Sequence, residues 1–156
     1  MHLNNLSSLY REVILDHAQH PHNRKKLENP SGQMELLNPT CGDAIMVQWT
    51  SEDNLIKEVA FEGYGCSISI ASASLMTDAL MGKSIEQAIQ LINTFNTLIT
   101  STEEISDSLL NELGDAVLLE GIQQFPARYK CAILAWRAIE YGINGQHQNT
   151  RRANLD

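Results

Sequence analysis

The stretch Asn38-Pro39-Thr40-Cys41-Gly42-Asp43-Ala44-Ile45-Met46-Val47-Gln48-Trp49 joins a tight turn to an alternating strand. Proline, glycine and aspartate in its first half are typical of a surface turn. In its second half Ile45, Val47 and Trp49 recur with a period of two, which predicts a half-buried strand. The turn also places a thiol, Cys41, two residues from a carboxylate, Asp43. We interpret the rest of the chain as a frame that holds this turn.

Strands are predicted on both sides of this unit. Residues 33–37 form a short apolar segment before the turn, and residues 55–62 return after the turn residues 51–54. Three consecutive strands with short links favour an antiparallel meander. The predicted fold class is α+β, with a small three-stranded antiparallel sheet and helices packed on it.

The helices are predicted from apolar spacing. Residues 6–17, 67–81 and 132–141 have apolar side chains at helical intervals, and the middle segment is rich in small residues that suit close packing. Ser84-Ile85-Glu86-Gln87 has the form of a capping box and predicts the start of another helix. Residues 97–121 change from polar to helical. We expect one domain over 1–142 and a flexible polar tail over 143–156.

Composition limits the classes of function. The chain has 156 residues, is 43% hydrophobic and 19% charged, and carries a formal charge of −8. A nucleic-acid partner is not expected, because phosphate backbones favour basic surfaces. No apolar run is long enough to cross a bilayer, and the first residues lack the features of a signal peptide. We expect a cytoplasmic protein with no membrane contact.

The acidic charge is concentrated in one segment. Residues 84–127 contain no Lys or Arg but seven acidic residues: Glu86, Glu103, Glu104, Asp107, Glu112, Asp115 and Glu120. The simpler interpretation is a solvated face on helices, and the alternative is a docking surface for a basic partner.

Three cysteines are the full complement of thiols: Cys41, Cys66 and Cys131. An odd number fits reduced thiols or metal ligands better than a disulfide framework. A buried cysteine can also act as a small hydrophobic residue. This is the default interpretation of Cys131 when it is considered by itself, and for Cys66 it is about as plausible as a functional role. However, Cys66 and Cys131 both precede predicted helices, where the helix dipole favours a thiolate, and Arg128 and Lys130 lie next to Cys131.

Considered together, the three thiols and Asp43 predict one metal site assembled from distant loops. Three thiolates and one carboxylate suit tetrahedral Zn(II). A structural zinc site would normally use closely paired cysteines, so the scattered spacing indicates a metal site that does more than stabilise the fold. Because a carboxylate is a weaker zinc ligand than a thiolate, such a site could exchange a ligand and release a nucleophilic thiolate.

His17, His20 and His22 offer a second possible set of metal ligands. His17 and His20 would share a helix face, but His22 lies beyond Pro21, which stops the helix. We therefore interpret two of the three as surface residues and His17 as a packed or capping group rather than a ligand.

The chain resembles the U-type iron–sulfur assembly proteins, the IscU/SufU group with the NifU N-terminal-like fold. The resemblance covers about residues 6–142 and is carried by these segments: Tyr10-Arg11-Glu12-Val13-Ile14, Asp16-His17, Asn38 to Asp43, Phe61 to Cys66, Ile70 to Ser74, Gly82-Lys83-Ser84 and Lys130 to Trp136. It implies an α+β fold of the SufE/NifU-like class, in agreement with the pattern above.

Within that group the chain is similar to the SufU branch. Scaffold members have a histidine before the last cysteine, where this chain has Lys130. They also have a Leu-Pro-Pro-Val-Lys chaperone motif, which Gln124 to Arg128 matches poorly. The segment between Ser84 and Pro126 is longer than in scaffold members, as in SufU proteins.

This resemblance implies a zinc-dependent sulfurtransferase that works with a PLP-dependent cysteine desulfurase of the SufS type and with downstream iron–sulfur assembly machinery. By resemblance, Cys41, Asp43, Cys66 and Cys131 bind zinc, Cys41 accepts persulfide sulfur, and Arg128 contacts the desulfurase. Lys130 would offset the negative charge of the ligands. Our mechanistic hypothesis is that Cys41 is released as a thiolate when the partner supplies a substitute ligand.

Two alternatives remain open. One is a scaffold that assembles and transfers a transient [2Fe–2S] cluster, for which thiolates and a labile donor are also suitable. The other is an inert adaptor stabilised by zinc. Lys130 separates the first alternative from sulfur transfer, because lysine cannot serve as the cluster ligand that histidine can.

Overall fold

Three long strands form where the sequence alternates. In the computed structural model, which describes residues 2–145 and 152–155, they are β1 (Gly32–Asn38), β2 (Asp43–Glu52) and β3 (Leu55–Tyr64). Both β1 and β3 pair with β2 in antiparallel register. The α+β class and the antiparallel meander are therefore confirmed.

The sheet has a fourth strand that the sequence analysis does not predict. Strand β4 (Arg152–Asn154) pairs in parallel with β1, so the sheet order is β3-β2-β1-β4 and the sheet is mixed. Beyond β4, the Leu155 amide donates to the Leu37 carbonyl at 2.7 Å, and Leu155 is buried. Part of the expected tail thus returns to the sheet; residues 146–151 and 156 lie outside the described residues. A three-residue strand is too short to show a periodic pattern.

The helices follow the predicted order; the first and last are longer than predicted, and the helix predicted over 67–81 ends one residue earlier. They are α1 (His2–Gln19), α2 (Ser67–Leu80), α3 (Ile85–Thr100), α4 (Asp107–Leu113) and α5 (Tyr129–Ile143), with 3₁₀ helices η1 (Gly114–Gln124) and η2 (Pro126–Arg128). The capping box that opens α3 is present, since Ser84 and Gln87 each bond the other's backbone amide. None of the described helices is long and apolar enough to span a membrane.

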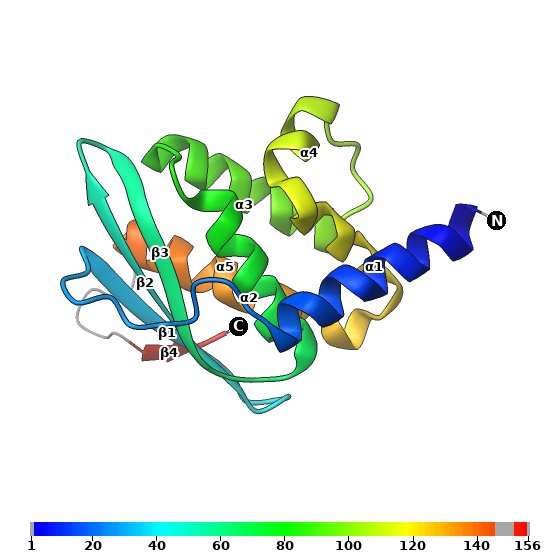
Figure 1. The fold of residues 1–156 in the computed structure, drawn as a ribbon, viewed down its shortest axis with the longest axis horizontal. Helices are drawn as coiled ribbons and strands as arrows, with labels where there is room; N and C mark the ends of the chain where they lie inside the picture. Colours follow the sequence, from blue (N-terminus) through cyan, green and yellow to red (C-terminus); the bar gives the residue numbers. More distant parts are fainter. Residues whose placement is uncertain (1, 146–151, 156) are drawn as a thin grey trace.

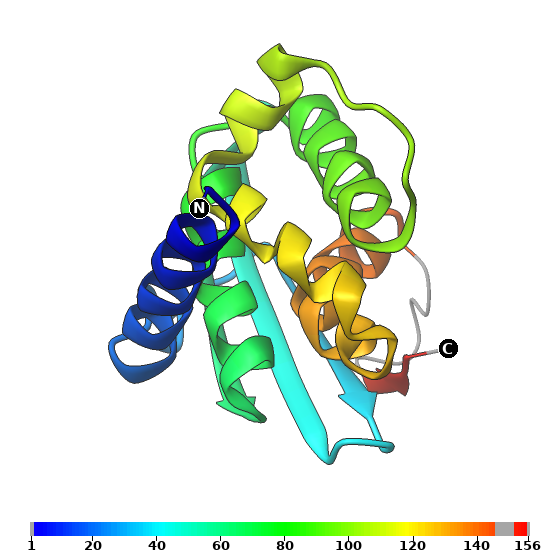
Figure 2. The ribbon, with the colours of Figure 1, turned by 90° about the vertical axis from the view of Figure 1, so that its right-hand side faces the viewer.

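The helices cover one face of the sheet (Figure 1). Helix α2 packs on β3, and α5 packs on β1 and β2. Helices α1 and α3 pack outside them, on α2 and α5 respectively, and η1 contacts both α1 and α3. Figure 2 shows these helices in front of the sheet. Helix α2 is therefore in the middle of the molecule.

The small residues of α2 let α5 approach closely. Residues 69–77 are all buried. Ser72 accepts a hydrogen bond from the Trp136 indole at 3.0 Å and donates to the Ala132 carbonyl. The Trp136 ring stacks on Phe95 with centroids 4.0 Å apart. This packing fixes the first turn of α5 beside the beginning of α2.

Candidate metal centre

The turn between β1 and β2 presents Cys41 to solvent. The Asn38 carbonyl accepts hydrogen bonds from the amides of Cys41 at 3.2 Å and Gly42 at 2.9 Å. Gly42 has φ +76°, a conformation that favours glycine. Cys41 is the exposed member of the three cysteines, so the turn holds an accessible thiol at the end of the sheet.

Asp43 lies just behind that thiol and is oriented by two donors. Its side chain is buried, 2% exposed. Oδ2 accepts from the Asn38 Nδ2 at 3.2 Å, and Oδ1 accepts from the Cys66 amide at 3.0 Å. A Cβ on Gly65 would lie 2.8 Å from Asp43 Oδ1 and 2.2 Å from Ser69 Oγ. Glycine at position 65 is therefore what allows this carboxylate to reach the start of α2.

Cys131 comes from the first turn of α5 and is fully buried. Its Sγ lies 3.5 Å from the Cys41 Sγ, across 90 residues of sequence. Asn38 Nδ2 also approaches the Cys131 Sγ, at 3.9 Å. Ligand atoms of Cys41, Asp43 and Cys131 all lie within 4.8 Å of one another. The helix starts at Tyr129, slightly earlier than predicted, so Cys131 lies inside its first turn.

Cys66 lies on the other side of Cys131, at the N-cap of α2. A hydrogen bond with the Cys131 thiol and further bonds with Ser69 lower the pKa of Cys66 to about 5, although burial opposes the shift. The same interaction, together with burial, raises the pKa of Cys131. The lowered pKa places the more acidic thiol of the pair at the start of α2, where the positive end of the helix dipole favours a thiolate. Cys66 is not a member of the compact group formed by Cys41, Asp43 and Cys131. Its hydrogen bond with the Cys131 thiol nevertheless places it next to that group.

The donor set fits a thiophilic divalent ion. Zinc–sulfur bonds of about 2.3 Å around a tetrahedral ion put neighbouring sulfurs about 3.8 Å apart, close to the 3.5 Å between Cys41 and Cys131. The two hydrogen bonds to Asp43 are the kind of outer contacts that orient a ligating carboxylate. Cys41, Asp43 and Cys131 thus offer three ligands for one ion, and Cys66, which interacts with Cys131, is the candidate for the fourth.

The two basic candidates lie at the edge of the centre. Arg128 is exposed and lines a groove of about 540 Å³ that also contains Tyr10, Cys66 and Phe125. Phe125 is 56% exposed, so the groove that Cys66 lines has an open apolar rim. Lys130 is half-buried in the first turn of α5, directly before Cys131.

Sequence reasoning missed the residues that orient the ligands. Asn38 donates a hydrogen bond to Asp43 and approaches Cys131. In the sequence, however, it is indistinguishable from an ordinary turn residue. Ser69 influences Cys66 from one turn into α2. The available signals were the asparagine at the start of the cysteine turn and a serine three residues after Cys66.

Comparison with known proteins gives a consistent result. The family described as NifU-like N terminal domain matches residues 9–132. The chain is 45% identical to the zinc-dependent sulfurtransferase SufU of Bacillus subtilis, over 89% of this chain and 92% of that protein. It is 41% identical to the iron–sulfur cluster assembly scaffold protein IscU of Streptococcus pyogenes, over 94% and 92% respectively.

Solved structures show the same fold. A protein of Fervidobacterium islandicum, described as a putative scaffold for iron–sulfur cluster assembly in the SUF system, superposes with a TM-score of 0.79 at 27% identity. That match covers 85% of this chain and 94% of the other. A NifU-like N-terminal protein from Brucella abortus has a TM-score of 0.76 at 17% identity, over 90% and 96%, and supports the fold alone.

Proposed function

The chain belongs to the NifU-like N-terminal domain family, whose members IscU and SufU are iron–sulfur cluster assembly proteins, and we propose that it is a zinc-dependent sulfurtransferase. It accepts persulfide sulfur from a PLP-dependent cysteine desulfurase of the SufS type and delivers it to downstream assembly machinery. The observation that carries this proposal is the pairing of one exposed thiol, Cys41, with the buried donors Asp43 and Cys131. The similarity to the Bacillus subtilis sulfurtransferase supports it.

The ligands are Cys41, Asp43, Cys66 and Cys131. Bound Zn(II) would supply positive charge that keeps the cysteines deprotonated near neutral pH. Three thiolates and a carboxylate exceed the charge of the ion, leaving about −2. Lys130, directly before Cys131, reduces this excess. The carboxylate of Asp43 is the weakest of the four ligands, because zinc binds thiolates more strongly, and Asn38 and the Cys66 amide orient it.

Cys41 is the sulfur acceptor. Its thiolate attacks the outer sulfur of the desulfurase persulfide; a sulfur–sulfur bond forms to Cys41 as the original one breaks. The desulfurase cysteine leaves as a thiolate, so the transfer needs no oxidant or reductant. Cys66 and Cys131 are half-buried and buried, which directs an incoming persulfide to Cys41. Arg128, on the groove beside Cys66, is available to contact the desulfurase.

The test compares Cys41→Ser with the parent protein in a desulfurase assay. The variant keeps its fold, because Cys41 is an exposed turn residue, but its stimulation of alanine formation falls to background. Ser67→Ala, an exposed residue next to Cys66 on the groove that Arg128 lines, is the control for surface changes and keeps its stimulation. Normal stimulation by the Cys41 variant would contradict the acceptor role.

A scaffold for a [2Fe–2S] cluster is the second candidate. The 41% identity to the Streptococcus pyogenes scaffold protein favours it, and thiolates are common cluster ligands. Lys130 favours sulfur transfer instead, since it cannot ligate iron as histidine does. Metal content and colour of the isolated protein distinguish the two: colourless protein with one zinc fits sulfur transfer, and brown protein with iron and sulfide fits the scaffold.

A further inference from the structure

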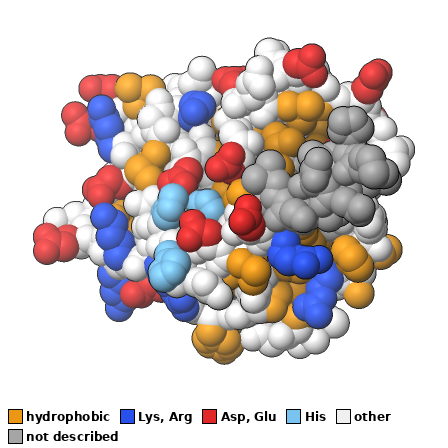
Figure 3. Space-filling model, turned by 45° about the vertical axis from the view of Figure 1, so that its right-hand side comes forward, with side chains coloured by type: hydrophobic (Ala, Val, Ile, Leu, Met, Phe, Trp, Pro, Cys, Tyr) orange, Lys and Arg blue, Asp and Glu red, His pale blue; other side chains and the backbone are white. Residues whose placement is uncertain are grey.

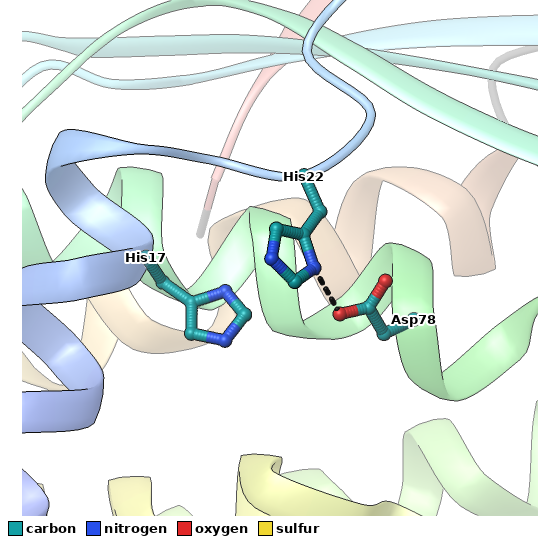
Figure 4. A group of neighbouring side chains, drawn as sticks. All are labelled: His17, His22 and Asp78. Atoms are coloured by element: carbon teal, nitrogen blue, oxygen red, sulfur yellow. Dashed lines mark hydrogen bonds and ion pairs between the residues drawn. The ribbon is translucent and has the colours of Figure 1, made fainter.

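A second group of metal-ligand side chains lies away from the cysteines. His17 comes from the last turn of α1, His22 from the loop after it, and Asp78 from the last turn of α2. One ring nitrogen of each histidine and one carboxylate oxygen all lie within 4.8 Å of one another. Figure 4 shows the two rings and the carboxylate gathered between α1 and α2. The ring centroids of the histidines are 4.6 Å apart.

One hydroxyl group holds both histidines in place. Ser74 Oγ lies 2.7 Å from the His17 Nδ1 and accepts the His22 backbone amide, also at 2.7 Å. A hydrogen bond to one imidazole nitrogen fixes the ring and leaves the other nitrogen for a metal. His17 is 5% exposed and forms the inner wall of the group.

His22 and Asp78 form the outer wall and can move. Their side chains are 49% and 45% exposed, and the His22 Nδ1 lies 2.6 Å from the Asp78 Oδ2. An incoming cation can take the place of this hydrogen bond, as metals commonly replace protons on their ligands. Donor atoms bound at about 2.0–2.1 Å to a tetrahedral ion lie about 3.3 Å apart. The two exposed side chains have room to rotate toward that spacing.

The surroundings are favourable to a cation. The group lies at the C-terminal turns of α1 and α2, the negative ends of two helix dipoles. Asp16 and Asp115 act electrostatically on His17 in addition to Asp78. Figure 3 shows histidine side chains among acidic ones on this face. Burial is the main cause that lowers the pKa of His17, which favours the neutral imidazole that binds metals.

We propose that His17, His22 and Asp78 form a second site, for a first-row divalent transition metal, independent of the cysteine centre. Two imidazoles and one carboxylate suit Zn(II) or Fe(II), with water at the remaining positions. The site is weaker than the cysteine centre, because it has one fewer protein ligand and two of its ligands are exposed.

The test adds Co(II) to full-length protein already loaded with one Zn(II). A second metal equivalent binds with weak d–d absorption and without a thiolate charge-transfer band. His22→Ala and Asp78→Asn each lower the second association constant at least tenfold and leave the first equivalent bound. Competition by Zn(II) and by Fe(II) under anaerobic conditions then distinguishes which ion the site prefers.

The matched control is His20→Ala, because His20 is an exposed histidine on the same segment and outside the group. This variant keeps both equivalents. Uptake of only one equivalent by the parent protein would overturn the proposal. The proposal would also be overturned if both His22→Ala and Asp78→Asn retain the second metal equivalent. An intense thiolate charge-transfer band from the second equivalent would overturn it as well, because that metal would be bound to cysteine.

Discussion

The two ends of helix α2 present opposite chemistry. At its start Cys66 is a low-pKa thiol at the positive end of the helix dipole, next to Cys131 in the first turn of α5. At its end Asp78 meets His17 where two negative helix ends converge. Twelve residues separate Cys66 from Asp78, about 18 Å along a helix. On our two proposals, one buried helix stabilises anionic thiolates at one end and a cation at the other.

Cys131→Ala is expected to have the largest effect on this comparison. Cys131 contacts both other thiols, so its loss abolishes tight zinc binding at the cysteine centre. The site formed by His17, His22 and Asp78 shares no ligand with it and keeps its own metal equivalent. Metal titration followed by elemental analysis measures both, and a variant that loses both equivalents would contradict the independence of the two ends.

Asp43→Ala removes the weakest ligand of the cysteine centre. Either zinc affinity falls by about 10–100-fold because a ligand is lost, or zinc exchanges more slowly because the three remaining thiolates hold it. Competition with a chromophoric chelator measures both affinity and exchange rate. Asp53→Ala, an exposed turn aspartate between β2 and β3, is the control and leaves both unchanged. If Asp43→Ala also leaves both unchanged, Asp43 is not a ligand.

Asn38→Ala tests the orientation of that carboxylate. Asn38 bonds Asp43 Oδ2 at 3.2 Å and approaches Cys131, and loss of such outer contacts typically weakens metal binding by about tenfold. The same chelator competition detects it. Rescue by Asn38→Gln is not expected, because the longer side chain displaces the amide. An affinity equal to that of the parent protein would show that Asn38 only closes the turn.

Ser74→Ala produces the smallest effect, at the other end of α2. The His17 ring and the His22 amide lose their shared partner, and an unpaired buried group costs about 1–3 kcal/mol of stability. The second metal equivalent binds a few-fold more weakly, while zinc at the cysteines is unchanged. Thermal unfolding and cobalt titration measure the two effects separately, and unchanged cobalt affinity would remove Ser74 from the support of the site.

The sequence predicted the three antiparallel strands and the cysteine turn because both follow short-range rules. Alternating residues specify β2, and few thiols in the chain make Cys41, Cys66 and Cys131 easy to identify as a set. Their proximity depends on tertiary packing of α5 against β1 and α2, which no local pattern encodes. The only sequence signal for a common site was that Cys66 and Cys131 lie at the N-terminal starts of α2 and α5, where the helix dipole favours thiolates.

The histidine group could not be predicted for a related reason. The interpretation of His17 as packed and of His22 as exposed agrees with their burial. However, a proline between them argued against a common site, and the third member, Asp78, comes from α2. Histidine and aspartate are frequent enough that their spacing carries little information. Strand β4 escaped prediction because its three residues, Arg152, Ala153 and Asn154, are too few to show an alternating pattern.

The central claim is that Cys41 is a sulfur acceptor beside a metal centre formed with Asp43, Cys66 and Cys131. The most direct measurement is mass spectrometry of the zinc-loaded protein after incubation with cysteine and its cognate desulfurase, followed by peptide mapping. We expect one added sulfur atom on Cys41, with Cys66 and Cys131 unmodified. Sulfur on either of the other two cysteines, or on none while the desulfurase is still stimulated, would contradict it.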